Sequence, residues 1–183
     1  MSTVFFDIDT QADFLFPGGA LYVPGAEAIV ENVATLNRYA ASQGIPVVST
    51  MDAHAPNDPE FAQYPPHCIV GTPGQRKPGA TLLHEGRQII LEKQTTDCFS
   101  NPDLPGLLQE LNADRAVVYG VVTEICVKNA TLGLLRHGLR VEVVMDAVRS
   151  LNETDAAAFV TEFTAAGGTL TTVDRVQVEL FEA

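Results

Sequence analysis

The stretch Tyr119-Gly-Val-Val-Thr-Glu-Ile-Cys-Val-Lys-Asn129 decides how the chain is interpreted. An apolar run over 116–119 reaches Gly120, and a helical pattern begins at about Glu124. This order predicts a strand, a tight turn and a helix that carries Cys126 in its first turn. The unpaired N–H groups and the dipole at a helix N-terminus favour negative charge. Cys126 is therefore a candidate for a thiol that reacts as an anion.

A helix N-terminus alone is not enough to ionise this thiol. An ordinary cysteine, with a pKa near 8.5, is only about 3% thiolate at pH 7, and lowering its pKa by about two units takes about 2.7 kcal/mol. A helix N-terminus supplies roughly 0.3–2 kcal/mol. Either a cation such as Lys93 stabilises the thiolate, or a carboxylate such as Asp9 removes the proton during attack. An ionised Asp9 would disfavour the thiolate, but Lys93 between the two would offset both negative charges.

Outward from this stretch, strand patterns alternate with helical patterns along the chain. The strands are expected at 3–8, 45–50, 88–92, 115–122, 139–145 and 170–173, and the helices at 26–42, 105–112, 124–137, from Asn152 or Thr154 to about 166, and from Asp174. Alternation of this kind predicts an α/β fold, a three-layer sandwich with a mainly parallel six-stranded sheet and helices on both faces. No linker or repeat interrupts it, so we expect a single domain over residues 1–183.

Chemically capable residues follow the predicted strands at their C-terminal ends, where ligands bind in such sheets. They are Asp9, Asp52, Lys93 and the turn before Cys126. Taken singly, each has a simpler interpretation: a buried cysteine, a strand-end aspartate that caps a loop, or a solvated lysine. Their occurrence together on one edge favours a catalytic site.

Composition excludes several classes of function. The chain has 183 residues, of which 46% are hydrophobic, and a formal net charge of −12. This charge argues against nucleic acid and anionic membranes as partners. No apolar run reaches membrane-spanning length, and the N-terminal segment lacks a basic region, so we expect neither a membrane span nor a secretory signal. The odd set Cys68, Cys98 and Cys126 does not suggest a disulfide framework. We expect a cytoplasmic protein. A homo-oligomer is compatible with these features.

A candidate metal site lies in the Pro- and Gly-rich loop at 53–80. Asp52 and His54 are two residues apart and share one side of an extended segment. His67 follows in Tyr64-Pro-Pro-His67, and Glu60 lies between the histidines, with Asp58 as an alternative to Glu60. Two histidines with one or two carboxylates suit one divalent ion, zinc first, with manganese or iron as alternatives.

These motifs together resemble the isochorismatase-like cysteine hydrolases, and within them the nicotinamidase/pyrazinamidase branch. The segments that carry the resemblance occur in the family's order: Asp9-Thr-Gln-Ala-Asp-Phe14, Asp52-Ala-His54, Tyr64-Pro-Pro-His67, Gly71-Thr-Pro-Gly74, Lys93 and Gly120-Val-Val-Thr-Glu-Ile-Cys-Val127. They span most of the chain, so the joint resemblance is far more specific than any single motif.

The resemblance implies a role for each matching residue. It implies a catalytic triad, a metal site, an oxyanion hole formed by two backbone N–H groups, a cis peptide before that hole, and side chains against the substrate. The implied triad is Asp9, Lys93 and Cys126, and the implied metal ligands are Asp52, His54, Glu60 and His67. The N–H groups of Val122 and Cys126 would form the oxyanion hole, and the cis peptide would join Val121 to Val122. The implied substrate contacts are Phe14, Tyr64 and Val121.

The implied activity is metal-dependent hydrolysis of nicotinamide to nicotinate and ammonia through a thioester, with pyrazinamide also accepted, as a step of NAD salvage. The alternative is a metal-free cysteine amidohydrolase of the same fold that acts on a carbamoyl or ureido substrate. That enzyme would keep Asp9, Lys93 and Cys126 but would have no use for Asp52, His54 and His67 together.

Overall fold

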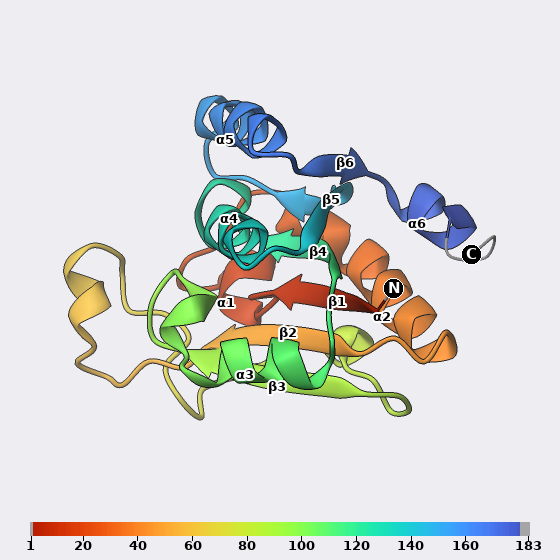
Figure 1. The fold of residues 1–183 in the computed structure, drawn as a ribbon. Coiled ribbons are helices and arrows are strands. Elements are labelled where there is room, and N and C mark those ends of the chain that lie inside the picture. The colour runs from red at the N-terminus through yellow and green to blue at the C-terminus, as the bar shows by residue number, and fades with distance from the viewer. Residues whose placement is uncertain (1, 180–183) are drawn as a thin grey trace.

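A six-stranded parallel sheet forms the middle layer of the computed structural model, which describes residues 2–179 (Figure 1). Its strands are β1 Thr3–Ile8, β2 Val47–Asp52, β3 Gln88–Lys93, β4 Arg115–Val121, β5 Arg140–Arg149 and β6 Thr169–Thr171. Their order across the sheet is β3-β2-β1-β4-β5-β6, and every adjacent pair is parallel. The central strands are apolar on both faces because both faces are covered.

Helices cover the sheet on two sides (Figure 1). One apolar core lies against α3, α4 and α5, and the other lies against α1, α2 and α6. The bounds are α1 Ala12–Leu15, α2 Val30–Ser42, α3 Asp103–Glu110, α4 Lys128–Arg136, α5 Glu153–Ala165 and α6 Val173–Glu179. No helix within residues 2–179 is long and apolar enough to cross a membrane.

The predicted α/β fold is confirmed, and its local differences have physical causes. The helix that carries Cys126 begins as a π-helical turn, Thr123–Val127, before the α-helical hydrogen bonding of α4 starts. The long loop contains three short 3-10 turns, Pro59–Ala62, Pro73–Gln75 and Gly79–Thr81, two of them started by proline. The expected single domain over 1–183 includes Met1 and 180–183, which lie outside the described residues.

The strand order reverses between β1 and β4, which places a crevice at their C-terminal ends. β2 and β3 lie on one side of β1, and β5 and β6 lie beyond β4. In Figure 1 the arrowhead of β1 points toward the side from which the yellow loop around 59–62 projects. The chain segments that carry Asp9 and Cys126 therefore leave adjacent strands at this crevice.

A buried polar cluster fixes the second half of the long loop to the sheet. The carboxylate of Asp7, on β1, lies 3.0 Å from the ammonium of Lys77 and accepts hydrogen bonds from Thr10 and Asn37. Lys77 also donates to the Thr10 hydroxyl at 2.6 Å. Both charged groups of the buried ion pair thus have hydrogen-bond partners, which is the condition under which such groups are tolerated inside a protein.

We expect Gly120→Ala to destabilise the fold. Gly120 has a φ of +116°, and a Cβ there would lie 2.1 Å from the carbonyl oxygen of Ile8 on the neighbouring strand. The strain and overlap should cost at least about 2 kcal/mol of unfolding free energy. Gly106→Ala is the matched control, because a Cβ there meets no atom within 4 Å and alanine favours a helix interior. Equal midpoints for the two variants in urea unfolding would contradict the prediction.

Candidate active site

Asp9 follows the last residue of β1 in a left-handed backbone conformation, with a φ of +49°. Its main-chain N–H lies 3.1 Å from the Thr50 hydroxyl, which in turn donates to Asp9 Oδ1 at 2.6 Å. The side chain is fully buried. A non-glycine residue in this region is costly and is typically held by surrounding structure at functional sites. Thr50 therefore fixes the direction in which the carboxylate points.

Lys93 ends β3 and is almost completely buried. Its ammonium lies 2.8 Å from Asp9 Oδ2, donates to Asp52 Oδ1 and to the Thr95 carbonyl, and lies 4.0 Å from Cys126 Sγ. The structure thus brings together the three residues for which a catalytic triad was predicted. It also links them to Asp52, the first residue of the predicted metal site.

Cys126 lies in the π-helical turn that follows β4. The peptide bond between Val121 and Val122 is cis, as the resemblance implied. The carbonyl of Val122 accepts the N–H groups of Ile125 and Val127, both at 3.1 Å, so this turn is tied together by its own backbone. The thiol is 7% exposed and faces the pocket at the end of the sheet.

The environment keeps the thiol protonated. Burial raises the pKa of Cys126 well above its usual value; Lys93 acts against this, and the carboxylates of Asp9 and Asp52 add to it. Burial also raises the pKa of Asp9, although Lys93 lowers it in part. Burial alone would lower the pKa of Lys93, but Asp9, Cys126 and Asp52 hold it well above the usual value. Of the two routes to a nucleophile, this arrangement favours proton removal by Asp9 over a resting thiolate.

Asp9 Oδ2 is the atom available to receive that proton. It makes no hydrogen bond within the described part of the chain, even though Lys93 Nζ is within ion-pair distance. Oδ1 is already engaged by Thr50. A carboxylate with one oxygen fixed by a hydrogen bond and the other held only by an ion pair can accept a proton and return it.

Asp52, His54 and His67 form a second cluster beside this group. One ligand atom from each lies within 4.8 Å of the others, and Asp52 Oδ2 is 3.7 Å from His54 Nε2 and 3.5 Å from His67 Nε2. His67 Nδ1 is 2.7 Å from the Pro65 carbonyl, which fixes its proton there and leaves Nε2 as a ligand atom. Both ring nitrogens of His54 are buried without a hydrogen bond to any described residue. These donors fit a divalent metal ion.

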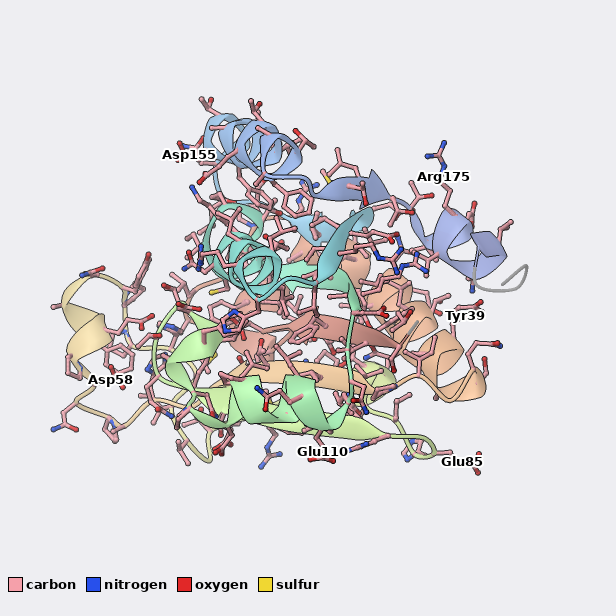
Figure 2. All side chains as sticks on the ribbon, viewed as in Figure 1. Tyr39, Asp58, Glu85, Glu110, Asp155 and Arg175 are labelled. Carbon is pink, nitrogen blue, oxygen red and sulfur yellow. The ribbon has the colours of Figure 1, made fainter. Side chains whose placement is uncertain are left out.

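The two alternative carboxylates occupy different positions. Asp58 Oδ2 lies 3.0 Å from Nδ1 of His54, the ring nitrogen that faces away from Asp52, at ion-pair distance but without hydrogen-bond alignment. Its Oδ1 accepts the N–H of Glu60 at 2.9 Å. Glu60 lines the pocket and lies outside the 4.8 Å cluster. Figure 2 shows Asp58 on the projecting loop. Asp58 is thus placed to orient His54, whereas Glu60 lies on the pocket wall together with Asp52 and His67.

Two of the three residues predicted to contact the substrate lie on the pocket wall, and the third does not. Phe14 and Tyr64 line the pocket, as expected. Val121, the last residue of β4, is fully buried in the core, and Val122 lines the wall in its place. Further wall residues that the sequence did not indicate come from four separate segments: Leu21, Thr96, Ile125 and Leu151.

Gln11 and Asp13 brace the site, and only their presence in the quoted Asp9–Phe14 motif could have indicated them. Gln11 donates to the Asp52 carbonyl at 2.8 Å and accepts the Asp52 N–H at 2.7 Å. Asp13 accepts the N–H of Cys68 at 2.7 Å, directly after His67. A Cβ on Gly74 would lie 2.2 Å from the Asp13 carboxylate, so the loop passes too close for any other residue. Gln11 thus holds the backbone of Asp52, and Asp13 holds the backbone directly after His67.

Comparison with known proteins agrees with this geometry. The family model described as "Isochorismatase domain" matches residues 3–175. The chain belongs to the isochorismatase family. The nicotinamidase of Escherichia coli K12 is 28% identical over 199 residues, which cover 91% of this chain and 92% of that protein.

Two solved structures match this chain closely in shape. One is pyrazinamidase of Pyrococcus horikoshii in complex with zinc, with a TM-score of 0.87 and 28% identity over 94% of this chain and 99% of that one. The other is N-carbamoylsarcosine amidase from Thermoplasma acidophilum, with a TM-score of 0.85 and 26% identity over 95% and 98% of the two chains. The isochorismatase scaffold thus carries more than one amidase activity.

We expect the loss of activity on the acid limb of the pH–activity profile to follow the protonation of Asp9. The base must be ionised, and burial raises its pKa above the ordinary 3.8, so kcat/KM should fall as pH drops through this raised value. The Thr50 hydroxyl lowers the pKa of Asp9, so Thr50→Val should move the limb to higher pH. Thr50→Ser keeps the hydroxyl and should leave the limb in place. A limb that Thr50→Val does not move would contradict this assignment.

Removal of the Asp58 carboxylate should weaken metal binding. Loss of an outer partner of a ligating histidine typically costs 10- to 100-fold in affinity, so we expect about that loss in Asp58→Ala, measured by competition with a chromogenic chelator. Glu31→Ala is the control, because that carboxylate pairs with Arg38 on the exposed face of α2. Wild-type affinity in Asp58→Ala would show that Asp58 does not orient His54.

Proposed function

We propose that this protein is a metal-dependent cysteine amidohydrolase that converts nicotinamide to nicotinate and ammonia and also accepts pyrazinamide. The observation that carries the proposal is the buried ammonium of Lys93, which lies between Asp9, Cys126 and the Asp52 end of a three-residue metal cluster. Relatives of the family that carry an activity name include nicotinamidases and a zinc-containing pyrazinamidase. We propose zinc for the metal, with manganese and iron as alternatives.

The substrate would bind with its ring between Phe14 and Tyr64. Phe14 lines the pocket from α1, and Tyr64 lines it from the long loop after β2. Asp52, His54 and His67, with Glu60, would hold the metal, which when bound orients the ring through its pyridine nitrogen. The carboxamide carbon would then lie over Cys126. Asp9 and Lys93 lie beneath it, away from solvent.

The chemistry would proceed in two halves. Asp9 Oδ2 takes the proton of Cys126 while Sγ bonds to the carboxamide carbon, and the oxyanion accepts the N–H groups of Val122 and Cys126. The C–N bond then breaks, and Asp9 returns the proton to the leaving nitrogen, which departs as ammonia. In the second half Asp9 takes a proton from water, whose oxygen bonds to the thioester carbon. The C–S bond breaks, and the thiolate regains its proton.

Lys93 would contribute by its charge throughout. The protonated ammonium offsets negative charge on Asp9 before attack and on Sγ as the proton leaves. It need not transfer a proton itself, because the neighbouring acids hold its pKa well above the usual value. This role matches the requirement for a cation that the isolated helix N-terminus cannot meet.

The charge of the pocket favours a neutral amide over the alternative substrate class. Its wall contains the acids Asp52 and Glu60 and, within residues 2–179, no arginine or lysine. The nearby ammonium of Lys93 is already engaged by two carboxylates. N-carbamoylsarcosine carries a carboxylate that would have no partner here, and a metal-free mechanism would leave His54 and His67 without a role.

The three cysteines are unpaired in the structure, which suits a reducing compartment. We therefore propose the cytoplasm as the place of action and supply of nicotinate for NAD salvage as the physiological role. The first proposal rests on the free cysteines, and the second rests on the chemistry proposed for the site.

Ammonia release from nicotinamide, pyrazinamide and N-carbamoylsarcosine, with and without chelator, tests the function. We expect release from the first two, loss after chelation and recovery with added zinc. Cys126→Ala should lower kcat by about a thousandfold or more, because no other group can form the thioester. Cys98→Ala is the control, since burial raises the pKa of Cys98 to about 12. Chelator-insensitive release from N-carbamoylsarcosine alone would establish the alternative amidohydrolase instead.

A further inference from the structure

We propose that Leu151 is a specificity-determining residue, which forms the roof of the ring pocket and is held there by Glu124. The inference rests on the proposed function and concerns the size of the aromatic amide that the site accepts. Leu151 lies in the connection between β5 and α5, twenty-five residues beyond the nucleophile, and lines the same pocket as Cys126.

The apolar side of the pocket comes from segments that are far apart in the chain. Leu151 shares this side with Phe14, Leu21 and Ile125. The pocket is small, so a bound ring would contact these side chains directly. In a pocket of this kind the size of one wall residue decides which substituents fit.

Glu124 ties the backbone at Leu151 to the turn of the nucleophile. Its Oε1 accepts the N–H of Leu151 at 2.9 Å and the N–H of Asn152 at 2.7 Å. Glu124 lies two residues before Cys126 in the π-helical turn. One carboxylate oxygen therefore fixes the distance between the attacking sulfur and the segment that covers the ring.

Polar side chains on either side of Leu151 also order this segment of the chain. The side chain of Asn152 accepts the N–H groups of Thr154 and Asp155 and so caps α5, whose first turn is marked by Asp155 in Figure 2. The Ser150 hydroxyl donates to Glu153 at 3.0 Å. Leu151 is thus an apolar side chain on a well-tethered backbone.

Core packing does not account for this arrangement. Leu151 is 44% exposed, so it contributes less to the core than a buried leucine would. The second oxygen of Glu124, Oε2, is buried and has no hydrogen-bond partner in the described chain, which is an unfavourable position for a carboxylate. A half-exposed leucine that lines the pocket gains burial when a ring binds beneath it. Substrate binding therefore supplies the contact that the free protein lacks.

The test compares nicotinamide with quinoline-3-carboxamide, which carries one additional fused ring. Leu151→Ala should lower kcat/KM for nicotinamide about tenfold, chiefly through KM, because the lost contact is a binding contact. It should favour the larger amide, so that the ratio of the two kcat/KM values moves about tenfold or more toward quinoline-3-carboxamide. Leu170→Ala is the matched control, since Leu170 is 38% exposed on the edge strand β6, away from this pocket. It should leave the ratio unchanged.

Glu124 is tested by a second pair of variants. Glu124→Ala removes the acceptor of both N–H groups and should move the substrate ratio in the same direction as Leu151→Ala. Glu124→Gln keeps an oxygen at the same position and should restore most of the wild-type ratio. If Leu151→Ala changed kcat/KM for both amides by the same factor, Leu151 would not determine specificity. If Glu124→Ala kept the wild-type ratio, Glu124 would not position Leu151. Wild-type protein that hydrolyses neither amide would instead overturn the proposed function, on which the roof depends.

Discussion

The ammonium of Lys93 is the interaction on which the rest of the site depends. It is buried with two carboxylates, Asp9 and Asp52, that come from two other strands. It favours the ionised form of both acids, because an unpaired buried charge costs far more than a paired one. Removal of one member of a buried ion pair typically costs about 3–5 kcal/mol. The strand ends of β1, β2 and β3 are therefore held together by one positive charge.

This charge also couples the two halves of the site. Two carboxylates and one ammonium leave an excess negative charge in a buried region, and it lies on the side of Asp52 that faces His54 and His67. A divalent cation at this cluster offsets that excess while it binds the two imidazole nitrogens. Because Asp52 is shared, occupation of the candidate metal site would alter how strongly Lys93 interacts with Asp9. Metal binding and the basicity of Asp9 would thus be linked through one side chain.

The fold and the chemical centre could be predicted from the sequence because both follow local patterns. Apolar runs defined the strands, and parallel strands bring Asp9, Lys93 and Cys126 to one edge whatever the loops do. Thr50 and Leu151 could not be predicted in this way, since their roles depend on contacts across 41 and 27 residues of sequence, with Asp9 and Glu124 respectively. The π-helical turn was missed for a related reason, because its residues have the same apolar pattern as an ordinary helix.

The difference between residues placed by strand ends and residues placed by loops explains how one scaffold can serve several amides. The residues proposed to act on the scissile bond lie on or beside strand ends, where sheet hydrogen bonds fix their positions. The structure superposes well on a pyrazinamidase and on an N-carbamoylsarcosine amidase. The wall around the remainder of the substrate comes from α1 and from loops after β2, β3 and β5. Loops can change without disturbing the sheet. Substrate choice is therefore free to vary on this scaffold, whereas the strand-end ion pairs constrain the chemistry.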